Sequence, residues 1–176
     1  MDPDRGEMRG WSSFWTQRAH AAQLLGKHEE ELDAAREMAR RYPDRRVAQV
    51  LEARALASMG DVRRLDSAFA VWEALPPDVY WSLGAAMVTA GEYLMQRGNE
   101  ADGKRVAERG VAWLANRLVA KPEDRGHRYW LGSGLYALQR YDDARPYFEA
   151  LATESPDRMR YRGLSALIAA RRGDRA

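Results

Sequence analysis

The sequence contains no cysteine. Disulfide bonds, thiolate metal sites and cysteine nucleophiles are therefore excluded. No apolar run approaches the roughly 18 residues that a membrane-spanning helix needs, and the first residues carry no apolar signal-peptide core. These features predict no membrane association and a cytoplasmic location.

The sequence also has almost no excess of positive or negative charge. The chain has 28 basic and 26 acidic residues, for a net charge of +2. This balance is no electrostatic footprint for nucleic acid. Lysine occurs only at positions 27, 104 and 121, so almost all basic residues are arginine. We interpret the excess of arginine over lysine as a result of GC-rich codon usage rather than as a sign of phosphate recognition.

Catalytic and metal-binding patterns are missing as well. The histidines are His20, His28 and His127, and the eight-residue spacing of the first two fits no zinc motif. No glycine-rich loop follows a strand pattern, and no serine lies in a nucleophile motif. Asp142 and Asp143 are adjacent on an expected helix, so their carboxylates face different sides and cannot share a substrate. The sequence therefore predicts no enzyme activity, no cofactor and no metal.

Glycine and proline recur in the sequence at regular intervals. Gly26 and Gly60 are 34 residues apart, and the pairs Pro43–Pro77 and Pro122–Pro156 have the same spacing. A period of 34 is typical of a helix–turn–helix repeat. Helices often end with a glycine in the left-handed conformation, and proline stops a helix. The pattern predicts repeats with a first helix, A, a glycine turn and a second helix, B, closed by proline.

The third repeat is irregular. Its closing prolines are 45 residues apart, and the glycine marks assign about 4 surplus residues to helix A and about 7 to helix B. These are close to one and two helical turns, which keep the buried face buried. We therefore expect this repeat to stay in the array with two longer helices. Gly103, Ala107 and Gly110 form a small-residue stripe on helix B that predicts close helix contact.

One segment resembles the tetratricopeptide repeat family closely. The residues are Tyr129-Trp130-Leu131-Gly132, Leu135-Tyr136-Ala137-Leu138, Tyr141-Asp142-Asp143-Ala144, Phe148 and Pro156. The resemblance implies an all-α fold, a right-handed α-solenoid of antiparallel helix pairs with about nine helices. In that family a small residue on helix B lets the helices approach. Glu31 and Leu65 stand at that position here, which predicts looser or shifted pairing in the first two repeats.

The expected boundaries of the repeats follow from the same glycine and proline positions. Residues 1–10 are an N-terminal extension, and residues 11–176 form a single solenoid. Its repeats span about 12–43, 46–77, 78–122 and 124–156, followed by a half repeat at 158–174. Gly173-Asp174 is the turn into a helix B that does not follow. We therefore expect the chain to be a fragment of a longer protein.

The family resemblance also implies a binding surface, because helix A faces line a concave groove that holds peptides or partner helices. The matching positions are Thr16, His20, Gln23, Val50, Arg54, Ala57, Glu92, Met95, Gln96, Tyr129, Ser133, Tyr136, Arg160 and Leu167. The alternative for each is ordinary solvated helix surface. Family members that grip a C-terminal carboxylate on chaperones carry Lys and Asn where Thr16 and His20 stand. That clamp is missing, so a chaperone-tail adaptor is disfavoured.

The resulting functional expectation is a protein-interaction scaffold for a protein or peptide, one part of a larger bacterial signalling or regulatory protein. The alternative is a nucleic-acid-associated regulatory domain that uses an arginine-rich surface. Its residues would be Arg158, Arg160, Arg162, Arg171 and Arg172.

A second candidate surface lies on the long helix B of the third repeat. Its overhanging turns carry Val111, Trp113, Leu114 and Leu118. An exposed patch of these side chains would support self-association as a homodimer. The alternative is that they cover neighbouring helices.

Overall fold

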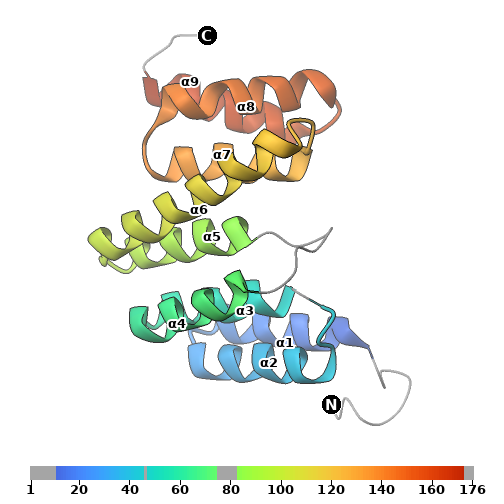
Figure 1. The fold of residues 1–176 in the computed structure, drawn as a ribbon, viewed down its shortest axis with the longest axis vertical. Coiled ribbons are helices and arrows are strands. Elements are labelled where there is room, and N and C mark those ends of the chain that lie inside the picture. Colours follow the sequence, from blue (N-terminus) through green and yellow to red (C-terminus); the bar gives the residue numbers. More distant parts are fainter. Residues whose placement is uncertain (1–10, 46, 75–82, 173–176) are drawn as a thin grey trace. The chain divides into compact units, whose positions relative to one another are not determined.

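The computed structural model describes residues 11–45, 47–74 and 83–172. Over these ranges the chain forms nine α-helices and no β-strand (Figure 1). The helices group into two compact units, residues 1–81 and residues 82–176. Each unit is built from consecutive helices joined by short turns.

Unit 1 contains the first two predicted helix pairs. Its helices are α1 (Ser12–Leu24), α2 (His28–Arg41), α3 (Val47–Ser58) and α4 (Val62–Glu73). Each helix packs against the next one in the chain, and α1 also packs against α3. The two A helices of this unit therefore lie side by side.

Unit 2 contains the other two pairs and one further helix. Its helices are α5 (Leu83–Gln96), α6 (Glu100–Ala120), α7 (Arg125–Ala137), α8 (Tyr141–Glu154) and α9 (Met159–Arg172). Sequential helices pack together, and the A helices α5 and α7 are also in contact. The predicted all-α class of helix pairs with about nine helices is confirmed. A single continuous solenoid over residues 11–176 stays a prediction, and the predicted extension at 1–10 and the Gly173-Asp174 turn lie outside the described residues.

The predicted glycine turns are present. Gly26, Gly60 and Gly98 have φ angles of +70°, +71° and +85°. After the second of these, the Asp61 carboxylate accepts a hydrogen bond from the Arg64 backbone N–H at 3.0 Å and caps α4. The turn between α7 and α8 differs, because Gln139 takes the left-handed conformation with φ +60°. That turn carries no glycine mark, so the spacing argument could not locate it.

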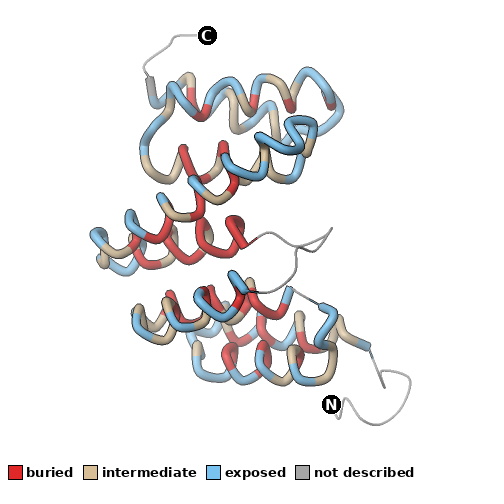
Figure 2. Tube along the Cα trace, in the orientation of Figure 1, coloured by how far each residue is buried: buried red, intermediate tan, exposed pale blue. Residues whose placement is uncertain are grey.

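Each unit has its own apolar core, which lies among the buried residues drawn in red in Figure 2. One cluster in unit 1 includes Trp15, Met38 and Leu51, and the cluster in unit 2 includes Phe148 and Leu151. Glu31 and Leu65, which replace the small residue of helix B, have no exposed surface. Both side chains are enclosed. The α3–α4 pair that carries Leu65 is nevertheless in much sparser contact than the α1–α2 pair that carries Glu31, so the expected looser pairing is observed in the second repeat and not in the first.

Helices α5 and α6 pack very closely because glycines face each other across their contact. A Cβ atom on Gly91 would lie 2.7 Å from the Gly103 carbonyl oxygen, and one on Gly110 would lie 2.8 Å from the Gly84 carbonyl oxygen. The predicted close contact at the α6 stripe is thus confirmed, and α5 supplies glycines opposite it. Helix α6 has 21 residues where α2 and α8 have 14, so the predicted surplus of about 7 is also confirmed. Helix α5 has 14 residues where α3 has 12, and residues 75–82 before it lie outside the described residues, so the predicted surplus of about 4 in helix A stays a prediction.

Candidate partner-binding site

Two of the predicted groove residues meet in unit 1. His20 on α1 and Arg54 on α3 are 34 residues apart in sequence, and Arg54 Nη1 lies 3.2 Å from His20 Nδ1. The reason is the repeat itself. Because α1 and α3 pack side by side, a shift of one period brings equivalent positions of successive A helices together.

A carboxylate from helix α2 completes this cluster. Arg54 Nε donates to Glu31 Oε1 at 2.5 Å, and Glu31 Oε2 lies 3.2 Å from His28 Nδ1. Glu31 is 0% exposed and Arg54 is 8% exposed. Buried charges persist only when they are paired and hydrogen-bonded, so Glu31 and Arg54 require each other. Sequence reasoning missed this role of Glu31, although a carboxylate at an expected small-residue position was a signal of it.

The contact between Arg54 and His20 also defines the tautomer of the histidine. A guanidinium has donors and no acceptor, so His20 Nδ1 must accept and the ring proton must be on Nε2. Burial, followed by the charge of Arg54, lowers the pKa of His20, and the charge of Glu31 opposes this in part. His20 is therefore neutral at neutral pH, and its exposed ring presents an Nε2–H donor.

One donor of the cluster has no partner among the described residues. Arg54 Nη2 is buried and makes no hydrogen bond there, and the same is true of Ser58 Oγ one helical turn further along α3. Since Glu31 neutralises Arg54, the cluster has no net charge when both histidines are neutral. Its chemistry is that of hydrogen-bond donors that can take an oxygen acceptor.

The other predicted groove residues of unit 1 expose less of their side chains to a partner than His20 does. Thr16 is half-buried, and its hydroxyl lies 3.7 Å from Met38 Sδ on α2. Gln23 and Val50 are half-buried as well. Ala57 has no exposed surface, so its transfer as a groove contact was wrong.

In unit 2 the predicted positions on α7 form an aromatic cluster with α9. The guanidinium of Arg160 lies 4.4 Å from the centre of the Tyr129 ring, within cation–π range. Tyr129 also contacts Tyr161, with ring centres 6.1 Å apart, and the Tyr136 and Tyr141 rings are 5.4 Å apart. These tyrosines and Ser133 are half-buried, whereas Leu167 on α9 is exposed. This surface combines aromatic rings with a cation.

The remaining groove positions are on α5. Burial raises the pKa of Glu92 to about 6. Met95 is half-buried and Gln96 is exposed.

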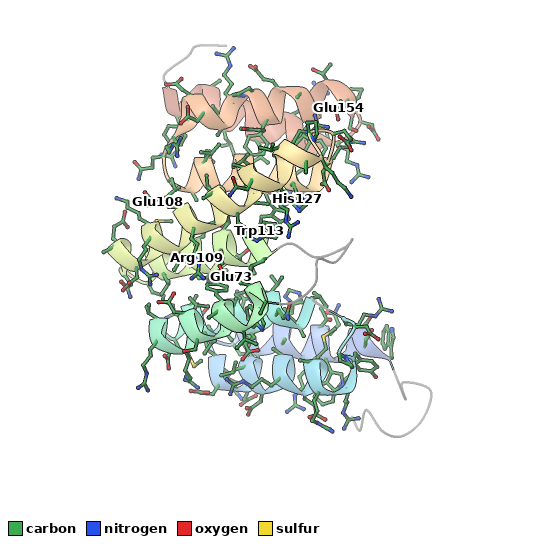
Figure 3. All side chains as sticks on the ribbon, viewed as in Figure 1. Glu73, Glu108, Arg109, Trp113, His127 and Glu154 are labelled. Carbon is green, nitrogen blue, oxygen red and sulfur yellow. The ribbon has the colours of Figure 1, made fainter. Side chains whose placement is uncertain are left out.

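The expected self-association patch is wrong for two of its four residues. Val111 and Leu114 belong to the buried core of unit 2, and Trp113 and Leu118 are half-buried against that core. The Trp113 ring meets His127 of α7 edge-on, with ring centres 5.7 Å apart (Figure 3). The alternative, that these residues cover neighbouring helices, describes them better because α6 packs on α7.

Part of the arginine-rich surface on α9 is engaged within unit 2. Arg160 packs on Tyr129, and a hydrogen bond with Tyr136 raises the pKa of Arg171. Arg158 and Arg162 are exposed, and the side chain of Arg172 lies outside the described residues.

In the ranges that the structure covers, no group of three or more His, Asp or Glu side chains is placed to hold a metal ion. None of the helices described is both long and apolar enough to cross a bilayer.

The fold and this site define a helix-pair repeat protein with a polar cluster between successive A helices. Two solved structures resemble the chain: a MamA RS-1 ArsTM double mutant and MamA residues 41 to the end from Desulfovibrio magneticus RS-1. Their TM-scores are 0.48 and 0.49, each at 19% sequence identity. Both matches cover 93% of this chain, and they cover 85% and 86% of the respective MamA chains. No protein-family model and no curated protein sequence matches.

Proposed function

We propose that this chain is a protein-interaction scaffold that binds a peptide segment of a partner along its A helices, as part of a larger bacterial signalling or regulatory protein. The observation that supports it best is the meeting of His20 and Arg54 across α1 and α3. Adjacent A helices thereby present hydrogen-bonding side chains at matching positions. Such a strip suits an extended or helical segment that crosses the two repeats of unit 1.

A second observation in unit 2 is consistent with this proposal. Half-buried Tyr129 and Tyr136 are on the A helix α7. Tyrosine offers large contact area and a polar tip at low entropic cost, and it is enriched at interfaces. The proposed function involves binding only and includes no catalytic step.

Selection from a displayed library of random 12-residue peptides on the full chain tests this proposal. We expect enriched peptides whose binding is weakened at least tenfold by His20→Ala with Gln23→Ala, or by Tyr136→Ala. The control is Asp33→Ala with Glu30→Ala, two exposed positions on α2. Circular dichroism must show equal helicity for all variants. Absence of any enriched peptide, or equal loss in the α2 control, would contradict a binding role for the A helices.

A further inference from the structure

Helix α9 presents a face that no other described helix covers. Its inner side is occupied, because Ile168 belongs to the core of unit 2 and Tyr161 and Leu164 pack against that core. A different side of the helix carries four exposed residues at helical spacing: Met159, Arg162, Ala166 and Ala170. Three of the four are apolar, and Met159 is 74% exposed. An apolar helix face of this kind is ordinarily buried against another element.

The neighbouring pair α7–α8 shows how an A helix of this unit uses the same face. Gly132 on α7 lies against α8, since a Cβ atom there would be 3.0 Å from the Phe148 ring. Ala166 follows Gly132 by one period of 34 residues, so it occupies the equivalent position on α9. Phe148 has no exposed surface, whereas Ala166 is exposed. The position that holds a helix B on α7 is therefore open on α9.

An arginine on this face repeats as well. Arg128 of α7 donates two hydrogen bonds to Glu154 at the end of α8, with distances of 2.5 and 2.9 Å. Its side chain is only 16% exposed in this pair. Arg162 stands 34 residues after Arg128, is exposed, and forms no ion pair in the described part of the chain. A bidentate site for a carboxylate is thus repeated on α9 without its carboxylate.

Charge selects the occupant of this face. Residues 159–172 contain four arginines and no Asp or Glu, and Arg158 directly precedes them. A second copy of α9 would place like charges against each other. A membrane surface would need large apolar side chains such as Trp, Phe or Leu, but Ala166 and Ala170 are small. A helix with an apolar stripe and acidic flanks matches both the small residues and the cations.

We propose that the exposed face of α9 binds an acidic amphipathic helix of a partner protein, in the manner in which α8 covers α7. The partner helix runs antiparallel to α9 and places a large apolar side chain over Ala166. Six residues further on, the spacing of Phe148 and Glu154, it pairs a carboxylate with Arg162. This surface is separate from the groove position Arg160, which faces Tyr129 of α7, so it is an interface beyond the proposed function.

The probe is a synthetic peptide that copies residues 141–155 and is kept helical by a lactam bridge between positions 145 and 149. Isolated helices of this length are marginal in water, so the bridge is needed. Arg145 and Glu149 are exposed in the chain, which keeps the bridge away from the contact surface. Calorimetry with the full chain should show one peptide bound per chain.

Two substitutions on α9 test where the peptide binds. Arg162→Glu should weaken binding at least about 10-fold, because it replaces an ion pair with like charges. A peptide carrying Glu154→Arg should bind this variant well and the unmodified chain poorly. That exchange also shows that the peptide does not replace α8 on α7, where its partner would be Arg128. Ala166→Arg should abolish binding, because it fills the apolar contact with a charged side chain.

Matched controls are available on α6 in the same unit. Lys104→Glu and Ala101→Arg reverse a charge and enlarge an alanine at exposed positions. Both should leave the affinity within about 2-fold of the unmodified chain. Since all four substituted positions are exposed, circular dichroism should show equal helicity for every variant. Vesicles of phosphatidylcholine and phosphatidylserine should not sediment the chain.

Four results would overturn the inference while the groove function stands. The peptide could fail to bind up to about 1 mM. Its affinity could be unchanged by Arg162→Glu and Ala166→Arg, or equally reduced by the α6 controls. The chain could instead bind the vesicles through Arg162 and be released from them by the peptide, which would assign the face to a membrane. The proposed function is tested separately, by the variants at His20, Gln23 and Tyr136.

Discussion

Glu31 lies at a position where a charged side chain needs a dedicated partner. It has no exposed surface, and its partner Arg54 comes from the next helix pair. Removing one member of such a pair leaves the other as an uncompensated buried charge. Replacing both with apolar side chains of similar size is often nearly neutral.

We therefore predict that Arg54→Ala lowers the free energy of unfolding by about 3–5 kcal/mol. Glu31→Leu with Arg54→Met should change it by less than about 1.5 kcal/mol. Urea denaturation followed by circular dichroism measures both. A loss below about 1 kcal/mol for Arg54→Ala would show that solvent reaches Glu31 after all.

Glu92 provides a prediction about pH. Burial raises the pKa of its carboxyl from 4.5 to about 6. The folded chain therefore binds this proton more tightly than the unfolded chain, and the charged form costs stability above pH 6. The cost is relieved as the pH falls from about 6 towards 4.5, and it corresponds to about 2 kcal/mol at neutral pH.

We accordingly expect Glu92→Gln to stabilise the chain by up to about 2 kcal/mol at pH 7.5 and by almost nothing at pH 4.5. Thermal unfolding across this pH range provides the comparison. Glu123→Gln changes an exposed carboxylate and should give no pH-dependent difference. A gain from Glu92→Gln that is equal at both pH values would contradict burial as the cause.

At the scale of elements, the α5–α6 pair depends on glycine for its close contact. A Cβ on Gly91 would meet the Gly103 carbonyl oxygen at 2.7 Å and the Ala107 Cβ at 2.8 Å, and neither can move without shifting a helix. We predict that Gly91→Ala destabilises the chain by about 1–3 kcal/mol despite the better helix propensity of alanine. The matched control is Gly163→Ala on α9, where a Cβ meets nothing within 4 Å.

This control should stabilise the chain by about 0.5–1 kcal/mol, because only the helix propensity changes. Opposite signs for the two glycine-to-alanine substitutions in urea denaturation are thus the expected outcome. Equal effects would mean that α5 and α6 can separate freely to accommodate the added methyl group.

The elements also show what the sequence could predict. Helix ends at Gly26, Gly60 and Gly98 followed from the need for a residue that tolerates positive φ. The turn at Gln139 did not, because a side chain there is strained by about 1 kcal/mol and tertiary packing must compensate. The long α6 was predicted from spacing, but Gly84 and Gly91 opposite it were not, since spacing within one helix does not identify the partner residues on another.

The candidate site was predictable to a similar extent. The period placed His20 and Arg54 at matching positions, and the structure brings them together. Their link to Glu31 was not predicted, because the family pattern has a small residue there and offers no rule for a carboxylate. For Val111 and Leu114 the sequence left open an exposed patch or cover for neighbouring helices, since the overhanging turns of α6 had no assigned neighbour, and the structure packs these side chains into the core that includes Leu131.

At the scale of the whole molecule, charge decides the alternative function. The 28 basic residues are nearly balanced by 26 acidic ones. We predict no binding to a 30-base-pair DNA duplex at 150 mM salt. At 50 mM salt any binding should involve few phosphates, with a slope of log affinity against log salt no steeper than about −2.

Fluorescence anisotropy measures this slope, and Arg158→Gln with Arg162→Gln removes two exposed charges, one directly before α9 and one on it. A slope steeper than about −5 that this variant reduces would restore the nucleic-acid alternative.

The bond from Arg54 to Glu31 has one more consequence, for how interchangeable the repeats are. In an ideal repeat array each unit meets its neighbours through the same apolar surface, so units can be deleted, duplicated or shuffled. Here the first pair carries a buried anion and the second pair carries its matching cation. Excising the second pair, or inserting another between the two, would leave Glu31 buried against a helix that lacks its cation. Loss of the first pair would instead expose Arg54 at the end of the array, so the first two repeats are matched to each other in one direction and the first cannot be moved without the second.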